Sequence, residues 1–487
     1  MLFFRTLAVE TADREGVLWP CAYVNFVILC EYMSFFDKTK HTWADKAALL
    51  GLLIAGLVIA YFMSVWRSVI KFSEPVELDY MGLCASVPVG NGWEGGRQWV
   101  YEENKFVLSS FFGPGQSSPT VVAHCRYLLG AVDVNSRAQI EEKTLVARGT
   151  ISEQGTLKAG PVGVDWVHMK VPATGARIGF DILFGSAQLP YGRVVNIEVR
   201  WSVPNAEKMA EEVFKRMVAG LEFKSSPLLD YGIKILDRMK AKGLGQFITE
   251  QNKQSYFVIK DGKGQPAGYV INILADLGSR IPMNIQAGSS FYLRGRRGQE
   301  EVIIFQCRDD LSEFVYKNET ASRFGRIGIE GVFDRAGVLA VREYGTFILG
   351  KGFEETTAEP FEEQFYRPGA ASIPDVLAEL VYGELLASEY ERILIDVIRA
   401  DGTIVPVVIS RADDDNRAEK KSTYAYKLRL DFLDQQDSYS QVYLDENEMI
   451  FKETLRRGAT YVLERSNPAE LGRVFPEKSS EILKYEE

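Results

Sequence analysis

The chain has 487 residues, more than one ordinary hydrophobic core accommodates, and its net charge is −10. Hydrophobic residues make up 46% and charged residues 25%, which is typical of globular proteins rather than of long disordered chains. The densest basic cluster is the short segment RGRRG at 294–298. Because phosphate neutralisation supplies most of the affinity for nucleic acid, this acidic composition argues against a nucleic-acid partner.

The first predicted element is a transmembrane helix over residues 47–66. Ala47 to Trp66 is a run of 20 residues without a charge, and ten of them are Leu, Ile, Val or Phe. A helix of this length spans roughly 30 Å, the thickness of a bilayer's hydrocarbon core. Those ten side chains favour insertion by roughly 3–6 kcal/mol. The run ends in Met-Ser-Val-Trp-Arg, a poor cleavage site for a signal peptide, so we expect an uncleaved signal anchor.

Residues 1–46 are expected to form an N-terminal tail. Within it, the apolar segment 18–36 contains Glu31, whose insertion costs nearly as much as the aliphatic residues gain, and a second span there is an alternative. Another alternative is a start at Met33, which would leave a short basic tail before the anchor. Three lysines precede the helix and two basic residues follow it, so the positive-inside rule favours, by a narrow margin, a body outside the cytoplasm.

Residues 76–225 predict one α/β domain. Strand-like runs alternate with turns, as in RIGFDILFGSAQLPYGRVVNIEVRWSV at 177–203. A helix follows, because apolar residues recur at helical spacing after Pro204 and the N-cap candidate Asn205. The polar face of this helix carries charges of both signs, which favours packing on a sheet over lying on a membrane surface.

Three segments of this domain carry a resemblance to a known fold. The opening VPVGNGWE, the strand GRVVNIEVRW and the helix AEEVFKRMVAGLEF resemble PsbP/Mog1-like α/β/α sandwich domains over residues 78–224. The resemblance consists of a turn, a strand pair and a helix, without a catalytic signature. It implies a binding or accessory module, since that fold is usually non-enzymatic, and it assigns a role to no residue.

The rest of the chain predicts a helical connector and a second domain. The connector covers residues 226–243, beginning with a Ser-Pro pair and ending at a glycine. Residues 245–487 predict a mostly antiparallel β domain, because strand-like runs are separated by hairpin turns such as DGKG and RADG. Helices are expected over 372–387 and from Asn467 onward.

The long antiparallel sheet, its internal helix and the closing segments YLDENEMI and YVLERS resemble the half-barrel of LolA-like periplasmic carriers over residues 245–466. In that fold a curved sheet surrounds an apolar groove plugged by helices. The resemblance implies a lipid or another hydrophobic ligand, and a plain structural sheet is the alternative.

Three glycine patterns imitate nucleotide-binding loops. The segment GTFILGKG at 345–352 lacks the Ser or Thr that binds Mg²⁺, and its interior reads as a strand with no helix after it. The second pattern, Gly262, Gly264 and Gly268, predicts a hairpin turn that leads into a strand. The third pattern, Gly325, Gly328 and Gly331, predicts a tightly packed strand.

No catalytic, cofactor-binding or metal-binding residue is assigned. His124 and His168 are the histidines of the body, and both are expected to be ordinary strand residues. The acidic run 413–416 lacks the ligand spacing of a Ca²⁺ loop. The remaining candidates are cysteines expected to be buried and acidic pairs without a placement: Cys84, Cys125, Cys307, Glu354/Glu355 and Glu362/Glu363.

Together these patterns predict a single-pass transmembrane helix followed by an α/β sandwich and an antiparallel β domain. The expected function is that of a non-enzymatic binding or accessory protein at a bacterial cell membrane. Its expected partners are the lipid bilayer, through residues 47–66, and a membrane protein complex or a hydrophobic ligand. A lipid carrier that uses a half-barrel groove, and an enzyme of unrecognised type, are the alternatives.

Overall fold

The computed structural model describes residues 43–485 apart from short gaps, and the chain divides after Ile70 into two compact units. The gaps are 79–81, 101–103, 114–119, 176–177, 225, 250–252, 279, 295–298, 323–324, 349–354, 358–362, 413–424, 434–437, 446–447 and 457–458.

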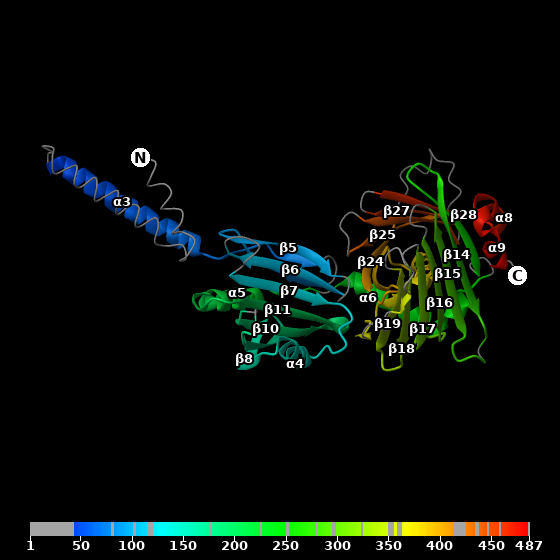
Figure 1. Cartoon of the computed structure of the whole chain (residues 1–487), viewed down its shortest axis with the longest axis horizontal. Helices are drawn as coiled ribbons and strands as arrows, with labels where there is room; N and C mark the ends of the chain where they lie inside the picture. The colour runs from blue at the N-terminus through cyan, green and yellow to red at the C-terminus, as the bar shows by residue number, and fades with distance from the viewer. Residues whose placement is uncertain are drawn as a thin grey trace. The chain divides into compact units, whose positions relative to one another are not determined.

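The described part of the first unit contains the helix α3 (Trp43–Ser68), which includes the predicted anchor 47–66 (Figure 1). Aliphatic side chains along it are exposed, among them Leu52 and Leu57. By length and apolarity, no helix among the described residues qualifies as a membrane span. The anchor therefore stays a prediction, and the segment 18–36 and Met33 lie outside the described residues.

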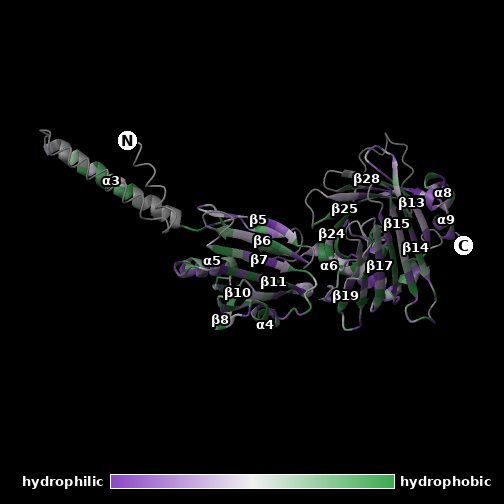
Figure 2. Cartoon of the chain, viewed as in Figure 1, coloured by the Kyte–Doolittle hydropathy of each residue, from purple (hydrophilic) through white to green (hydrophobic). Residues whose placement is uncertain are grey.

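The first large sheet of the second unit is antiparallel and has seven strands in the order β5-β6-β7-β11-β10-β9-β8. Its strands are β5 (Trp93–Val100), β6 (Lys105–Phe112), β7 (Val121–Leu128), β8 (Thr150–Ala159), β9 (Val162–Val171), β10 (Phe180–Leu189) and β11 (Arg193–Trp201). Figure 2 shows hydrophobic and hydrophilic residues alternating along several of these strands, as expected where successive side chains point to opposite faces.

Two helices cover opposite faces of this sheet, α4 (Ser136–Ala147) and α5 (Glu207–Ala219). Ile140 of α4 packs with Phe184 of β10, whereas Phe214 of α5 lies against the next strand residue, Gly185. Since adjacent strand residues face opposite sides, the sheet lies between the two helices. This layered arrangement is the one that the resemblance to PsbP/Mog1-like domains implies, and α4 is a helix that the sequence reading did not predict.

Four short strands precede the seven-stranded sheet, and one more short strand and a helix lead from it to the large sheet. The strand β1 (Lys71–Phe72) pairs with β4 (Pro88–Val89), and β3 (Leu83–Ala85) pairs with both β2 (Val76–Leu78) and β12 (Glu222–Phe223). The predicted connector is α6 (Pro227–Lys242), followed by the 3-10 turn η4 (Leu244–Phe247). Ser226 is its N-cap residue and Gly243 follows its last turn with a positive φ, as predicted.

The described remainder of the chain is dominated by one sheet of 16 strands, mostly antiparallel as predicted. Its strands are β13 (Gln254–Lys260), β14 (Pro266–Asp276), β15 (Ile285–Leu293), β16 (Gln299–Cys307), β17 (Phe314–Ser322), β18 (Gly325–Phe333), β19 (Leu339–Ile348), β20 (Glu355–Thr357), β21 (Gln364–Tyr366), β22 (Ser372–Pro374), β23 (Arg392–Ile398), β24 (Ile404–Arg411), β25 (Tyr426–Phe432), β26 (Tyr439–Asp445), β27 (Glu448–Arg456) and β28 (Ala459–Ser466). The pairing of β13 with β28 joins the first and last strands of this region.

Two predicted helix starts differ from the structure. The segment 372–387 begins as β22, which pairs with β23 in parallel, and only then forms the 3-10 turn η5 (Asp375–Leu377) and α7 (Leu380–Ala387). Pro374 is extended and cannot donate a helical hydrogen bond. Likewise, Asn205 lies inside the 3-10 turn η3 (Pro204–Ala206) that Pro204 begins, and α5 starts at Glu207 without a side-chain cap.

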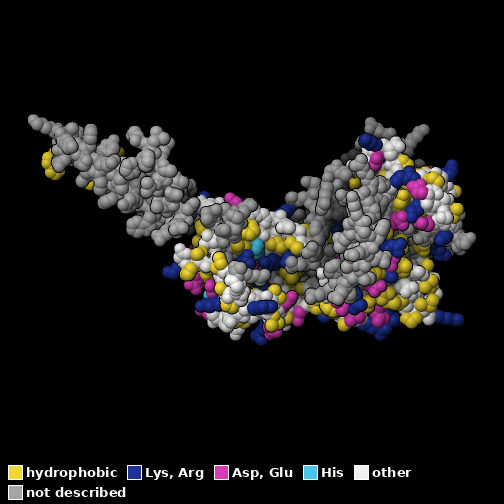
Figure 3. Space-filling model, in the orientation of Figure 1, with side chains coloured by type: hydrophobic (Ala, Val, Ile, Leu, Met, Phe, Trp, Pro, Cys, Tyr) yellow, Lys and Arg dark blue, Asp and Glu magenta, His cyan; other side chains and the backbone are white. Residues whose placement is uncertain are grey.

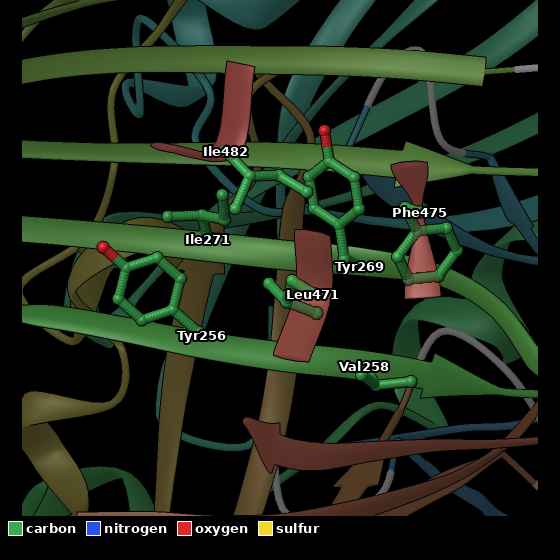
Figure 4. Close-up of a cluster of buried hydrophobic side chains, with 7 residues drawn as sticks. All are labelled: Tyr256, Val258, Tyr269, Ile271, Leu471, Phe475 and Ile482. Atoms are coloured by element: carbon green, nitrogen blue, oxygen red, sulfur yellow. The ribbon is translucent and has the colours of Figure 1, made fainter. Parts of the chain in front are cut away.

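The C-terminal helices α8 (Pro468–Val474) and α9 (Ser479–Ile482) cover one face of the large sheet, with the turns η6 (Pro476–Lys478) and η7 (Leu483–Tyr485) beside them. Asn467 caps α8, as predicted, by accepting a hydrogen bond from the backbone N–H of Glu470. Figure 4 shows the packing between helices and strands: Leu471, Phe475 and Ile482 with Tyr256, Val258, Tyr269 and Ile271. We call the face of the large sheet that α8 and α9 cover the outer face, and the opposite face of the sheet the inner face.

A buried salt bridge joins the two large sheets. Arg193, at the start of β11, donates two hydrogen bonds to the carboxylate of Asp396 on β23, at 2.9 and 3.0 Å. A further N–H of Arg193 donates to the hydroxyl of Tyr127 at 2.8 Å. Both charged side chains are only 4% exposed.

Backbone contacts strengthen this joint. The side-chain amide of Asn104 donates to the carbonyl of Gly402 and accepts from the N–H of Ile404, so it pairs with the turn between β23 and β24. The N–H of Arg367 donates to the carbonyl of Gly130. Residues 71–487 accordingly form one compact unit, and the domain boundary near 225–245 stays a prediction.

Candidate functional site

Both histidines of the body lie on strands of the seven-stranded sheet, as predicted. The Nδ1 of His124 is 3.0 Å from the hydroxyl of Ser109, and strand register places both residues in line with Glu198. The Nε2 of His168 lies 3.1 Å from a carboxylate oxygen of Asp181. Each histidine therefore has a polar partner of a kind found in hydrolytic centres.

The contacts of Ser109, His124 and Glu198 are those of a structural polar network rather than of a catalytic triad. Arg126 and Lys143 both bind the carboxylate of Glu198, and although burial raises its pKa, these cations lower it to about 2. Burial and Arg126 lower the pKa of His124 to about 4, so its imidazole is neutral at neutral pH. Because β6 pairs with strands on both sides, the backbone N–H groups around Ser109 are used in the sheet rather than offered to an oxyanion.

We expect His124 to stay neutral between pH 5.5 and 8, where an ordinary histidine titrates. Its folded-state pKa of about 4 lies below the ordinary 6.5, so the unfolded chain binds the proton first as pH falls. The stability of the fold should therefore be fully retained above pH 6.5 and decline as pH falls from 6.5 to 4. NMR can follow the three histidines of the chain separately, with His124→Gln to assign the signal. A His124 signal with a midpoint near 6.5 would contradict this expectation.

The glycine patterns lie in turns and strands, as predicted. Gly262 and Gly264 lie in the β13–β14 turn, Gly268 in β14, Gly325, Gly328 and Gly331 in β18, and Gly345 in β19. A Cβ atom at Gly331 would overlap the ring of Tyr316, so β18 requires glycine there. Residues 349–352 of the phosphate-loop-like segment lie outside the described part of the chain.

The described cysteines and carboxylates show no arrangement that holds a metal. Cys84, Cys125 and Cys307 are free and buried, and burial raises the pKa of Cys125 to about 12, which disfavours the reactive thiolate. Where the chain is described, no group of three His, Cys, Asp or Glu side chains could hold an ion. Of the acidic candidates, 413–416, Glu354 and Glu362 lie outside the described residues, Glu355 begins β20, and Glu363 pairs with Arg342.

A surface depression of about 540 Å³ lies between α6 and the segment 389–392 that leads into β23. The rings of Tyr231 and Tyr390 stack in it, with centroids 4.4 Å apart and planes 11° from parallel. Lys234 and Arg238 lie over these two rings at 5.7 and 5.8 Å. Aromatic and cation–π contacts of this kind attach the segment to α6, which gives the depression a structural role.

The inner face of the large sheet carries both apolar and acidic side chains over β16–β19. Strand pairing aligns Ile303, Asn318, Ile329 and Glu343 in one row across this face. The two isoleucines are half-buried. The basic residues of these strands occupy the alternate positions, on the outer face: Lys317, Arg326 and Arg342. On the described surface visible in Figure 3, by contrast, basic and acidic side chains are intermixed.

A polar cluster lies within this inner face. The Nδ2 of Asn318 donates to a carboxylate oxygen of Glu301 at 2.9 Å, and Tyr316 lies two residues before Asn318 on the same side of β17. Asn318 is 6% and Tyr316 7% exposed, yet among the described residues the Oδ1 of Asn318 and the hydroxyl of Tyr316 have no hydrogen-bond partner. Burial raises the pKa of Glu301, and the charges of Asp375 and Asp401 raise it further.

The sequence alone does not identify this cluster. Glu301 follows another glutamate, Glu300, and only the register of β16 decides that Glu301 faces inward. The one sequence signal for this cluster is a polar residue, Asn318, within a strand-like run. That signal is weak, because polar residues are ordinary at half of the positions of an antiparallel sheet.

Comparisons with known proteins give weak likenesses of fold. No protein-family model and no curated protein matches the sequence. Among solved structures, cyanobacterial PsbP (CyanoP) from Synechocystis is 8% identical, with a TM-score of 0.25, over 32% of this chain and 94% of its own. A β-barrel-like protein of the domain of unknown function DUF1849 from Brucella abortus is 9% identical, with a TM-score of 0.31, over 44% of this chain and 94% of its own. These matches agree with the weak resemblances read from the sequence, and they carry no argument about function.

Proposed function

We propose that this chain is a membrane-anchored binding or accessory protein, held at a bacterial cell membrane by residues 47–66 with its body outside the cytoplasm. The observation that best supports binding is the inner face of the large sheet. Half-buried apolar side chains such as Ile303 and Ile329 lie there beside the buried, unpartnered polar atoms of Asn318 and Tyr316. A sheet that serves only as a filled core ordinarily satisfies its buried polar atoms.

A non-enzymatic role fits the polar residues of the seven-stranded sheet. Glu198 is committed to Arg126 and Lys143, and Ser109 is held inside a fully paired strand. The buried joint through Arg193 and Asp396 fixes the two sheets to one another. Such a joint suits a body that presents a ligand or a partner in a constant orientation.

A carrier of lipid or another hydrophobic ligand is the second candidate. It is favoured by the apolar half of the inner face, where Phe291, Ile303, Ile327 and Ile329 are all half-buried. Native mass spectrometry of the detergent-extracted chain separates the candidates, because a carrier should retain lipid on the 54.7 kDa protein. A lipid-free body that retains a partner subunit would instead favour the accessory role.

Two arginines in the anchor are expected to release the protein from the membrane. Each costs about 2.5–3.5 kcal/mol at a bilayer centre, so Leu53→Arg with Leu57→Arg should outweigh the roughly 3–6 kcal/mol gained by the aliphatic side chains. The measurement is the share of protein in the membrane pellet after an alkaline carbonate wash, with Leu53→Ala and Leu57→Ala as the matched control. Release of the unchanged chain by the wash, or a reporter after Glu487 that is active only in the cytoplasm, would contradict the proposal.

A further inference from the structure

We infer that one end of the seven-stranded sheet docks on the surface of the bilayer, where exposed aliphatic side chains enter the headgroup region and basic residues bind anionic lipid. The inference rests on the proposal that residues 47–66 anchor the chain, and it adds a second membrane contact, made by the body. It is carried by the place where the chain enters this sheet and by the apolar and basic side chains that are exposed there.

Strand register identifies this end of the sheet. Residues at the end pair side by side across all seven strands, in the order Trp93, Phe112, Val121, Trp201, Asp181, Lys170 and Thr150. The chain enters the body beside them, because Lys71 pairs with Val89 of β4, and the turn 90–92 leads from there to Trp93. The opposite end carries Arg193 and the joint with the large sheet. We call the first of these two ends the entry end.

The predicted anchor lies close to the entry end along the chain. Its last residue is Trp66, and four residues separate it from Lys71. An extended chain covers at most about 3.6 Å per residue, so the five steps from Trp66 to Lys71 reach no further than about 18 Å. A helix that spans the bilayer therefore holds the entry end within this distance of the lipid headgroups.

Three aliphatic side chains near the entry end are more exposed than any comparable side chain described in the body. Leu145 and Val146, in the last turn of α4, are 78% and 77% exposed, and Ile178, which precedes β10, is 77% exposed. The other exposed large hydrophobic side chains described between residues 71 and 485 reach at most 51%. Single exposed aliphatic side chains are ordinary, but a group of them marks a contact surface.

Val171, the last residue of β9, connects these side chains to the entry end. A Cβ at Gly149, just after α4, would lie 3.5 Å from a side-chain carbon of Val171, and a Cβ at Gly179 would lie 3.1 Å from its backbone oxygen. The C-terminal end of α4 and the residue after Ile178 therefore both meet β9 where it ends. Lys170, the neighbour of Val171, belongs to the row that defines the entry end.

The charge of the entry end favours anionic lipid. Arg148, Lys170 and Arg200 are exposed there, and within the described part of the chain none of the three forms a salt bridge. Asp181 pairs with Lys170 across the strands, but its carboxylate lies 3.1 Å from the Nε2 of His168. Aliphatic side chains flanked by Lys and Arg are typical of segments that lie on a membrane, because the chains enter the headgroup region while the cations attract anionic lipid.

A protein partner fits this surface less well. Protein interfaces are enriched in aromatic residues and depleted in lysine. At the entry end the large aromatic side chains of Trp93 and Trp201 are buried, and the exposed side chains are aliphatic or basic. The occupant that the composition favours is therefore a lipid surface.

The test places the fluorophore NBD, whose emission rises when it leaves water, on Val146→Cys of the full chain reconstituted in lipid vesicles. Cys21→Ser and Cys30→Ser remove the tail cysteines, and Cys84, Cys125 and Cys307 are buried. We expect higher emission in vesicles of phosphatidylcholine with phosphatidylglycerol than in phosphatidylcholine alone, and quenching by lipids with brominated acyl chains. The matched control is NBD on Ile304→Cys, on the outer face of the large sheet, which should give the same emission in both vesicles.

Two pairs of substitutions separate the charged and apolar contributions. Arg148→Gln with Lys170→Gln should lower the ratio of docked to undocked protein at least tenfold in the anionic vesicles, since each basic residue near an anionic surface adds to the attraction. Leu145→Ser with Ile178→Ser should lower this ratio in both kinds of vesicle, whereas Ile304→Ser with Val332→Ser should leave it unchanged. Circular dichroism confirms that all these variants fold.

Three outcomes would overturn the inference. If the label at residue 146 stays in water while the chain resists the carbonate wash, the anchor stands and the entry end is left to a protein partner. Equal docking on both vesicles, unchanged by Arg148→Gln with Lys170→Gln, would mean a contact that does not recognise anionic headgroups. Release of the unchanged chain by the wash would contradict the anchor, and the docking inferred from it as well.

Discussion

Replacing Asp396 with alanine is expected to destabilise residues 71–487 by about 3–5 kcal/mol, because it leaves the guanidinium of Arg193 buried and charged without its partner. Arg193 donates two hydrogen bonds to Asp396 and one to Tyr127, and both ions are 4% exposed. Solvent therefore cannot replace the lost carboxylate. Urea unfolding followed by tryptophan fluorescence measures the loss as a lower midpoint.

Two variants make this result specific. Arg193→Met combined with Asp396→Leu removes both charges, so it should be far less destabilising than Asp396→Ala alone. Glu211→Ala breaks the exposed pair with Lys215 and should cost less than about 1 kcal/mol. If Asp396→Ala changes the urea midpoint no more than Glu211→Ala does, Arg193 and Asp396 are not a buried pair in solution, and the two sheets are not joined as described.

Local signals in the sequence are sufficient to predict many of the helices and strands. The run QSYFVIK coincides with β13, because alternation and bounding turns are properties of consecutive residues. The Ser-Pro start and glycine stop of 226–243 coincide with α6, and Asn467 caps α8. In each case a few neighbouring residues determine the structure, so no knowledge of distant contacts is needed.

Polar contacts between residues far apart in the chain cannot be predicted from such local signals. Arg193 and Asp396 are 203 residues apart, and each looks like an ordinary charged residue of a strand. Asn104 precedes a strand, where it would be taken for a turn residue, yet it pairs with the backbone of Gly402 and Ile404. The polar cluster at Glu301 and Asn318 depends in the same way on the register of four strands.

Gly232→Ala is expected to destabilise the same unit by about 2–3 kcal/mol. Glycine to alanine inside a helix ordinarily stabilises by up to about 1 kcal/mol. Here the sign should be reversed, because a Cβ at Gly232 would overlap the backbone oxygen of Leu394, and backbone cannot move aside cheaply. The measurement is again the urea midpoint. The control is Gly96→Ala on β5, where a Cβ has no atom within 4 Å and should change the midpoint little.

The two substitutions test one joint, since Gly232 contacts Leu394 and Arg193 binds Asp396, two residues further along β23. The Cβ at Gly232 would also meet the side chain of Ile395, which points to the opposite side of β23 from Asp396, so α6 and Arg193 contact the same strand from opposite faces. Because both contacts involve this short stretch of β23, a shift of the strand caused by Gly232→Ala should weaken the salt bridge as well, and the double variant with Asp396→Ala should lose less stability than the sum of the two. Strict additivity would mean that α6 and Arg193 contact β23 independently.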